Sequence, residues 1–596
     1  MAAEITRRGF ARAGLATTLG LAGGAGKARE NKSSQMSKAS KAGDSSMTAA
    51  DLVVRLLKAH GVPFLSTLCG NGLDPLLASC QRNGLGIFDV RNEQAAGYMA
   101  DAVGRLTGRV GVCSASSGIA HVNALTGLTN AFFDGSPVLL ITGASSSSKA
   151  GMGNFQDLDH VSLAKPVCKF AQRVDRPERV ALAVHEALSL AESGRPGPVN
   201  LCIPEDVLRA KVDETDALEW VGEAEKRLKD GVNSSRSMAD SELVSEVVGA
   251  LSSSRRPLLV AGSGVFYAGA QESLRVLARA VGSPILTPIW DRGSVDRPVP
   301  EYLGVIGAAS GGPKLLSEAD VILLVGTQVD YRVGYMQPPA VARDVLVIRI
   351  DCEPSQIDQG VSANVGLLGD PASILSQLCE EWQRLDLRPR KGWLAEAQRR
   401  NAAYRAQWDK FPASSSMTGH HLVEALRPLI TDDLTFLVDG GNIGQWAHVL
   451  LWDRYPGHWL TCGASGVVGW GLPGAIAARL LRPDHPVLLL SGDGAIGFTI
   501  TELEIAVRHE VPIVVVIADD QAWGIVASGQ MKSLGGPIAS ILGPVDYARV
   551  ARGFGARGVI AKTPEELTAA TRQALRARKP TVIEVPIALL GPTDAA

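Results

Sequence analysis

The sequence predicts an α/β protein built from three domains, each with a parallel sheet covered by helices. Short apolar runs rich in β-branched residues alternate with segments whose apolar residues recur at helical spacing. Polar or charged stretches at 223–240 and 386–416 separate three such regions. A chain of 596 residues, 46% hydrophobic and 20% charged, is long and apolar enough for three cores. The predicted domains are 47–222, 240–385 and 417–590, preceded by a separate segment, 1–46.

Each predicted domain contains this alternation in its own sequence. The first has the helical run AADLVVRLLKAHG and then the strand-like runs RVGVCSAS, SPVLLITGA and GPVNLCIP. The second has RPLLVAGSGV, the helical run AQESLRVLARAVG, and then SPILTPI, ADVILLVGT and DVLVIRIDCEP. The third has the strand-like runs LTFLV, PVLLLSG and VPIVVVIAD. Strands that alternate with helices in this way favour parallel sheets.

Two aspartates in the third domain form the most informative pattern of the chain. Asp493 lies in PVLLLSGDGAIGF, and Asp520, 27 positions later, ends VPIVVVIADD. Each acid ends a predicted buried strand, so we expect both at the carboxyl edge of one sheet, where open α/β sheets bind ligands. Gly492 and Gly494 let the backbone approach an anion closely. Carboxylate oxygens beside a helix start that offers N–H groups to phosphate predict a Mg²⁺–diphosphate site.

This spacing resembles the signature of thiamine diphosphate (ThDP) enzymes, which starts with Gly-Asp-Gly and ends about one strand–helix–strand unit later. The domain order resembles the acetolactate synthase/pyruvate oxidase branch, with pyrimidine-binding, central Rossmann-like and diphosphate-binding domains; parts also resemble 2-hydroxyacyl-CoA lyase and benzaldehyde lyase. The resemblance implies Mg²⁺ bound by Asp493, Asp520 and the backbone carbonyl of Ala522. The family usually has Asn where Asp520 stands, so this chain adds a negative charge beside the diphosphate.

A segment of the first domain resembles the one that carries the family's catalytic glutamate. Glu93 lies there, in DVRNEQAAGYMADAVGRLTG. The resemblance implies that Glu93 hydrogen-bonds the aminopyrimidine ring and activates ThDP, a role that needs a carboxyl group in an apolar pocket. Gly70 and Asn71 are expected to face the cofactor opposite Glu93. Gly72 stands where benzaldehyde lyase has a histidine, and that departure argues against identical chemistry.

Two further residues of the first domain are candidates for substrate contact. His121 follows Gly118-Ile119-Ala120, where the family usually has Gly-Pro-Gly; a purely structural histidine is the alternative. Gln156 lies in Gly-Asn-Phe-Gln, which resembles the Phe-Gln segment that lines the substrate channel across a dimer. With Glu93, these residues form the predicted catalytic set.

The third domain contains two more segments that resemble cofactor-binding loops. Gly440 and Asn442, in DGGN after LTFLV, are implied to hold the diphosphate. In TCGASGVVGWGLPG, Val468 is implied to prop ThDP in its bent conformation, while the Gly466 carbonyl accepts from its 4′-amino group. A simple packing role in a tight turn is the alternative for Val468. The predicted cofactor-binding set is completed by Gly492, Asp493, Gly494 and Ala495.

These resemblances predict a ThDP- and Mg²⁺-dependent 2-oxoacid decarboxylase/carboligase, a lyase or transferase of the acetolactate synthase type, acting on a small 2-oxoacid or acyloin. The alternatives are a 2-hydroxyacyl-CoA or acyloin lyase and, in another class, a non-catalytic ThDP-binding homologue. The resemblance also implies a homodimer or homotetramer with active sites at the interface. The central turn Ala261-Gly-Ser-Gly264 resembles a nucleotide-binding turn, but it is weak evidence and FAD is the less favoured reading.

The remaining expectations concern partners and location. A net charge of −2 gives no argument for nucleic acid, and no stretch after residue 46 has the length and apolarity of a membrane span. Arg7 and Arg8, followed by the weakly apolar residues 13–26, resemble a twin-arginine export signal and predict a periplasmic protein. A start at Met36 or Met47 would instead give a cytoplasmic enzyme.

Overall fold

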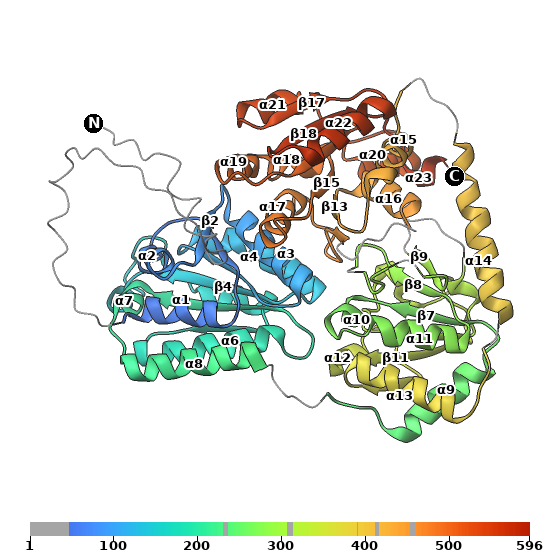
Figure 1. Ribbon diagram of the computed structural model, residues 1–596, viewed down its shortest axis with the longest axis horizontal. Helices are drawn as coiled ribbons and strands as arrows, with labels where there is room; N and C mark the ends of the chain where they lie inside the picture. Colours follow the sequence, from blue (N-terminus) through green and yellow to red (C-terminus); the bar gives the residue numbers. More distant parts are fainter. Residues whose placement is uncertain are drawn as a thin grey trace, which may run out of the picture.

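The computed structural model confirms an α/β protein with three parallel six-stranded sheets among the described residues. Figure 1 shows the N-terminal domain in blue to teal and the central domain in green to yellow, both below the C-terminal domain in orange to red. The structure describes residues 47–230, 236–291, 293–297, 299–306, 314–389, 391–411, 416–452 and 459–595. The predicted export signal lies outside these ranges.

The N-terminal sheet has the strand order β2-β1-β3-β4-β6-β5. Its strands are β1 (Phe64–Thr67), β2 (Gly86–Asp89), β3 (Gly111–Ala115), β4 (Val138–Ala144), β5 (Phe170–Arg173) and β6 (Pro198–Pro204). The helices are α1 (Ala49–Ala59), α2 (Asp74–Asn83), α3 (Glu93–Thr107), α4 (Ile119–Asp134), α5 (His160–Ala164), α6 (Val180–Glu192), α7 (Glu205–Arg209) and α8 (Glu214–Asp230). Strands β4 and β6 are buried along their whole length, as the continuous apolar runs predict for a parallel sheet covered on both faces.

The central sheet has the order β12-β11-β10-β7-β8-β9, which is the Rossmann order when the strands are numbered from β7. Its strands are β7 (Pro257–Ala261), β8 (Ile285–Pro288), β9 (Tyr302–Ile306), β10 (Val321–Val325), β11 (Leu346–Asp351) and β12 (Val365–Leu368). The helices are α9 (Ser241–Ser253), α10 (Ser263–Tyr267), α11 (Gln271–Val281), α12 (Pro354–Ile357), α13 (Pro371–Arg384) and α14 (Lys391–Ala406).

The C-terminal sheet repeats the strand order of the N-terminal sheet, as β14-β13-β15-β16-β18-β17. Its strands are β13 (Thr435–Asp439), β14 (Leu460–Thr461), β15 (Val487–Gly492), β16 (Val514–Asp519), β17 (Arg557–Ile560) and β18 (Thr581–Pro586). The helices are α15 (Gly419–Leu426), α16 (Gly441–Leu450), α17 (Gly471–Leu481), α18 (Asp493–Gly497), α19 (Leu503–Arg508), α20 (Gly524–Leu534), α21 (Tyr547–Gly553), α22 (Pro564–Arg576) and α23 (Pro592–Ala595).

The two polar stretches that separate the predicted domains, 223–240 and 386–416, are partly helical. Helix α8 continues through the first half of the 223–240 stretch, with Ala217 and Ala224 buried against the N-terminal core. Helix α14 fills most of 386–416 and packs Trp393 and Ala397 on the central domain. Both helices are strongly polar with only a narrow apolar stripe, so their composition alone does not indicate a helix that packs on a domain.

Candidate active site

The two aspartates of the third domain lie at one edge of the C-terminal sheet. Strands β15 and β16 pair in parallel with Gly492 opposite Ala518, so Asp493 and Asp520 leave the sheet side by side. Asp493 is only 3% exposed. The neighbouring-strand arrangement inferred from the sequence is therefore present.

A third carboxyl group joins this pair. Asp519, the last residue of β16, interacts with the Asp493 carboxyl, and burial raises its pKa as it does that of Asp520. Burial and the nearby Asp520 carboxylate raise the pKa of Asp493 to about 7. Carboxylates that share a buried space repel one another unless a proton or a cation lies between them. Asp493 and Asp520 offer the hard oxygen ligands that a divalent cation prefers. The sequence reasoning missed Asp519, although the Asp-Asp doublet was its signal.

Hydrogen bonds fix the orientation of both predicted metal ligands. Asn442 Nδ2 donates to Asp520 Oδ2 at 2.9 Å, and the Ala522 amide donates to Asp520 Oδ1 at 3.2 Å. The Gly494 amide donates to Asp493 Oδ1 at 2.8 Å. Within the described ranges, no cluster of three or more His, Cys, Asp or Glu side chains forms a ready metal site. A cation here would thus need further oxygens, such as the Ala522 carbonyl and those of a diphosphate.

The floor of this region is made of backbone. A side chain at Gly440 would bring its Cβ to 3.0 Å from the Gly492 nitrogen, and a Cβ at Gly494 would lie 2.7 Å from the Trp523 ring. The Tyr547 hydroxyl donates to the Asp493 carbonyl at 3.2 Å. A cavity of about 480 Å³ opens here, lined in part by Asp493, Gly494, Phe498, Trp523, Leu542 and Tyr547. Ala495, the third residue of α18, is 3% exposed.

Glu93 is the first residue of α3 and is 9% exposed. The side chain of Asn92 caps this helix by accepting from the Gln94 amide at 2.9 Å. Asn123 Nδ2, on α4, donates to Glu93 Oε2 at 3.1 Å, a partner that the sequence reasoning missed. Glu93 lies in the N-terminal domain and Asp493 in the C-terminal domain, where it accepts from the Gly494 amide, so the two carboxyl groups have different hydrogen-bond partners.

Neutral groups occupy the carboxyl edge of the N-terminal sheet. Asn71 Nδ2 donates to Ser117 Oγ at 3.2 Å and to Ser145 Oγ at 3.1 Å. Gly70 packs so closely on Ser116 that a Cβ there would lie 2.6 Å from the serine Cβ. The loop predicted to face the cofactor is thus bonded to the loops that follow β3 and β4.

Gly72 leaves no room for the histidine found at this place in benzaldehyde lyase. Its φ is +85°, and an added Cβ would lie 2.7 Å from the Ala144 nitrogen and 2.8 Å from the Ala144 oxygen. Any side chain at position 72 would require the backbone at the end of β4 to move. The departure seen in the sequence is therefore built into the local packing.

The predicted substrate-contact residues lie in different environments. Gln156 packs against Gly118, where any Cβ would collide with it, and the Gly118 amide donates to His160 Nε2 at 2.8 Å. His121 is fully buried, with Nδ1 2.8 Å from Thr142 Oγ1. Burial and the neighbouring His160 lower the pKa of His121 to about 4. This position gives no support to a substrate contact by His121 and favours the structural alternative.

Residues 461–470, which we call the glycine loop, carry Gly466 and Val468. Gly466 is exposed and has a φ of +64°, while Val468 is half-buried. At the end of the loop, Asp439 accepts from the Gly471 amide at 2.7 Å. Burial raises the pKa of Asp439 to about 6. The loop thus runs from β14 to α17 beside the end of β13.

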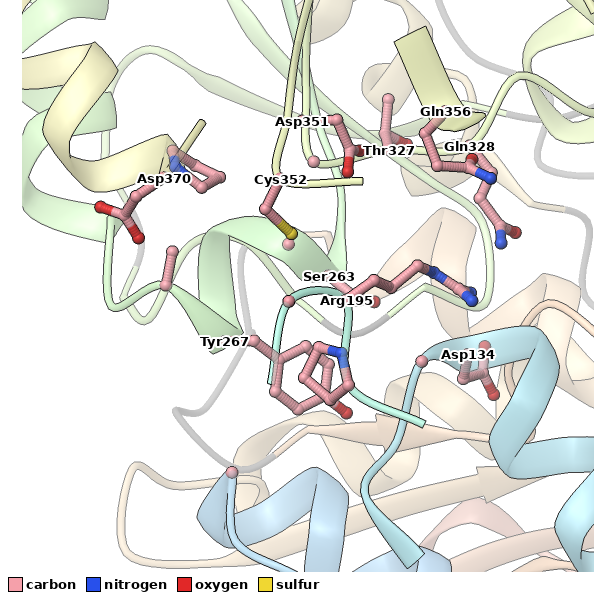
Figure 2. Close-up of a pocket in the computed structure, with 18 of the residues that line it drawn as sticks. Asp134, Arg195, Ser263, Tyr267, Thr327, Gln328, Asp351, Cys352, Gln356 and Asp370 are labelled. Carbon is pink, nitrogen blue, oxygen red and sulfur yellow. The ribbon is translucent and has the colours of Figure 1, made fainter. Parts of the chain in front are cut away.

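A second cavity of about 530 Å³ lies between the N-terminal and central domains. The predicted nucleotide-binding turn contributes Ser263 and Gly264 to its wall. Figure 2 shows the Arg195 side chain between Asp351 of the central domain and Asp134 of the N-terminal domain. The aspartates 493 and 520 are not among the residues that line this cavity.

Three segments of the chain match descriptions of one enzyme family. Residues 47–163 match "Thiamine pyrophosphate enzyme, N-terminal TPP binding domain", residues 244–378 match its central domain, and residues 439–585 match its C-terminal TPP binding domain. Each match falls on one of the three sheets described above.

Whole-chain relatives have two kinds of name. The chain is 30% identical over 578 residues to "2-hydroxyacyl-CoA lyase 2" of Homo sapiens, covering 91% of this chain and 90% of the relative. It is 29% identical over 563 residues to "2-hydroxyacyl-CoA lyase 1" of Mus musculus, covering 91% and 94%. It is 26% identical over 561 residues to "Probable acetolactate synthase large subunit" of Methanocaldococcus jannaschii, covering 92% and 93%.

Proposed function

We propose that this chain, which belongs to the thiamine pyrophosphate enzyme family, is a Mg²⁺-dependent enzyme that makes or breaks a C–C bond next to a carbonyl. The observation that carries the proposal is the buried carboxylate cluster of Asp493 and Asp520, oriented by Asn442, at the edge of the C-terminal sheet. These two acids and the Ala522 carbonyl would hold Mg²⁺, and Gly440 with Asn442 would bind the diphosphate. ThDP, when bound, supplies a nucleophilic carbon and holds the electron pair released as the substrate bond breaks.

The N-terminal domain would supply the proton chemistry. Glu93 is a buried carboxyl group whose Oε2 accepts from Asn123, which leaves its other oxygen for a proton at the aminopyrimidine ring. Gln156 would hydrogen-bond the substrate. A purely dipole-favoured glutamate would be expected at the surface, whereas this one is largely buried.

Two substrate classes fit the family. The higher identity to 2-hydroxyacyl-CoA lyases favours a lyase that cleaves a 2-hydroxyacyl thioester. The full-length similarity to an acetolactate synthase large subunit supports a second candidate, the 2-oxoacid decarboxylase/carboligase expected from the sequence. Both reactions need the same two half-sites, so the fold alone does not choose between them.

The test is a substrate screen with product mass spectrometry. Purified protein with ThDP and Mg²⁺ is offered 2-hydroxyacyl-CoAs, 2-oxoacids and acyloins in parallel. We expect turnover of one class and none with Glu93→Gln protein. Bound ThDP without turnover of any class would instead favour the non-catalytic homologue.

Assembly as a homodimer or homotetramer belongs to the same proposal. Large apolar side chains are exposed beside both half-sites, a feature that marks interaction surfaces. They are Ile119, Val122, Met152, Phe155 and Leu158 in the N-terminal domain and Phe498, Ile525 and Val526 in the C-terminal domain. Sedimentation velocity should show a dimer or larger species; a stable, active monomer would contradict this.

Among the described residues no helix has both the length and the apolarity needed to cross a bilayer.

Two expectations remain proposals with direct tests. The cavity between the N-terminal and central domains is a candidate for FAD or ADP, FAD being less favoured; the absorbance spectrum and nucleotide extraction of purified protein would decide.

Export is tested by fractionating cells that express the full chain and an Arg7→Lys/Arg8→Lys variant. Cleavage before residue 47 in the periplasm, lost in the variant, is expected; an intact cytoplasmic protein starting at Met36 or Met47 would contradict it.

A further inference from the structure

A buried charge cluster lies where the N-terminal and C-terminal domains meet. Asp101 and Arg105 belong to α3, and Asp134 ends α4. Their side chains are 0%, 3% and 5% exposed. Arg105 Nε donates to Asp101 Oδ2 at 2.8 Å, and Arg105 Nη2 pairs with Asp134. Charges removed from water are costly unless their geometry is well satisfied, so the placement of this cluster needs an explanation.

The charge cluster is hydrogen-bonded to the backbone of the glycine loop. Arg105 Nη1 donates to the Thr461 carbonyl at 3.2 Å. Asp134 Oδ1 accepts from the Ala464 amide at 2.7 Å. Between these points, Gly463 has a φ of +91°, and a Cβ there would collide with the Asp134 carboxylate. The backbone of the loop and the two charged side chains are thus fitted to each other.

The far end of the loop is held by the same cluster. Trp470 Nε1 donates to Asp101 Oδ2 at 2.7 Å, and the Arg105 guanidinium lies 5.1 Å from the Trp470 ring centroid. Asn130 Nδ2 donates to the same Asp101 oxygen at 3.0 Å, and its Oδ1 accepts from Ser465 Oγ. Side chains of α3 and α4 thus hydrogen-bond the glycine loop at both of its ends.

This loop needs an external hold. Gly463, Gly466 and Gly469 all have positive φ values, of 91°, 64° and 87°, so the segment depends on glycines that lose more conformational freedom on ordering than other residues. The loop also carries Val468, which with Gly466 is expected at the aminopyrimidine end of the cofactor. The C-terminal end of the loop is bonded within its own domain, where the Gly469 carbonyl accepts from Thr499 Oγ1 at 2.7 Å. Gly466 and Val468 lie on the part that α3 and α4 hold, so a change there is expected to alter the aminopyrimidine end more than the diphosphate end.

We propose that Arg105 and Asp134 are positioning residues that hold the glycine loop in the conformation that receives the aminopyrimidine ring of ThDP. The inference rests on the proposed function, because it assumes that ThDP binds here. Both side chains would act through the backbone of Thr461 and Ala464, to which they are hydrogen-bonded. The competing explanation is that the cluster only joins the two domains, in which case it affects stability and both ends of the cofactor alike.

The test compares the two ends of the cofactor in one protein. Asp134→Asn keeps an oxygen for the Ala464 amide but removes the charge that pairs with Arg105. Isothermal titration of apoprotein with ThDP and Mg²⁺ should show affinity weakened by about tenfold or more, the scale of a charged hydrogen bond. Competition by inorganic diphosphate with Mg²⁺ should change by less than about twofold, because Asp493 and Asp520 are untouched.

The matched control is Asp296→Asn, which removes the same charge from an ion pair with the buried Arg275 in the central domain, away from the loop. It should leave both affinities unchanged. If Asp134→Asn weakens ThDP and diphosphate equally, or neither, the positioning role is wrong. If wild-type protein binds diphosphate but no ThDP, the proposed function fails instead.

A milder variant covers the case in which Asp134→Asn does not fold. Ser465→Ala removes the hydroxyl that donates to Asn130 and that accepts from the Val467 amide at 3.2 Å. We expect a smaller loss of ThDP affinity, of about threefold, with diphosphate competition unchanged. An unchanged ThDP affinity in this variant would overturn the proposal.

Discussion

The N-terminal and C-terminal domains share a strand order but differ at the edge where ligands bind. In each domain an asparagine follows the strand that comes first in the sequence, β1 or β13. Its side-chain amide hydrogen-bonds residues that follow other strands of the same sheet. In the C-terminal domain Asn442 donates to Asp520, beside Asp493. In the N-terminal domain Asn71 donates to Ser117 and to another serine hydroxyl.

The difference teaches how one fold makes two half-sites. The parallel sheet brings the same three strand ends together in each domain, and the residue types there set the charge. Buried carboxylates repel one another and therefore favour a bound cation. A divalent cation held there can in turn bind the oxygens of a diphosphate. Neutral hydroxyl and amide groups suit an uncharged ring and a carbonyl substrate, with the buried Glu93 carboxyl group for proton transfer.

The largest predicted effect comes from changing equivalent positions in the two domains. Asp493→Ala should abolish Mg²⁺-dependent ThDP binding, because the diphosphate loses its main counter-charge. Ser117→Ala, at the matching strand end, should weaken ThDP binding by no more than a few-fold, the scale of one neutral hydrogen bond. Both are measured by isothermal titration. Asp493→Ala should unfold no earlier than wild type, because it relieves repulsion among buried carboxylates.

Glu93→Gln should separate binding from activation. We expect ThDP to stay bound while H/D exchange at its C2 atom slows by on the order of 10², a typical general acid–base contribution. Proton NMR of the quenched enzyme measures this exchange. Asn123→Ala, which removes only the partner of Glu93, should give a smaller loss. Unchanged exchange in the Glu93→Gln protein would refute the assignment.

A pH series distinguishes a structural from a catalytic His121. Its pKa is lowered to about 4 by burial, so the folded chain keeps it neutral while the unfolded chain takes up a proton below about pH 6.5. The free energy of unfolding should therefore fall as the pH drops from about 6.5 towards 4, by about 1 kcal/mol at pH 5.5. His121→Gln should lack this part of the decline in chemical denaturation. A variant with wild-type acid sensitivity but no turnover would favour catalysis.

The smallest expected effect is that of Asp520→Asn. The substitution keeps an oxygen ligand and restores the residue usual in the family, so activity should remain and ThDP should bind at least as tightly. Steady-state kinetics over a range of Mg²⁺ concentrations measures it. A dead enzyme would contradict the assignment of position 520 to the ligand site where the family usually has asparagine.

How far the sequence could predict this molecule depended on the distance between interacting residues. Asp493 and Asp520 were placed on neighbouring strands because each ends its own apolar run, a local pattern. Asn123, the partner of Glu93, could not be identified because its position depends on how α3 packs on α4. The bond between Asp134 and Ala464 joins residues 330 positions apart, and no periodicity encodes it.

The helices within the two polar stretches that separate the domains could not be predicted for a related reason. Helix α8 is recognisable only through small buried residues such as Ala224, whose burial depends on the neighbouring α1. His121 shows the same limit, since its sequence neighbours do not reveal that it faces Thr142 inside the domain. Local motifs thus predicted strand ends and loops, whereas contacts between helices needed the fold.

The central claim is that Glu93 and the aspartate cluster serve one cofactor although they lie in different domains, and that a second chain completes each site. Glu93→Gln and Asp493→Ala proteins, each inactive alone, are mixed under conditions that allow subunit exchange, and turnover is measured. If sites form between chains, about a quarter of the sites in an equimolar random mixture of dimers receive both intact halves, and activity returns. Exchange verified by mass spectrometry with no recovery of activity would contradict the account.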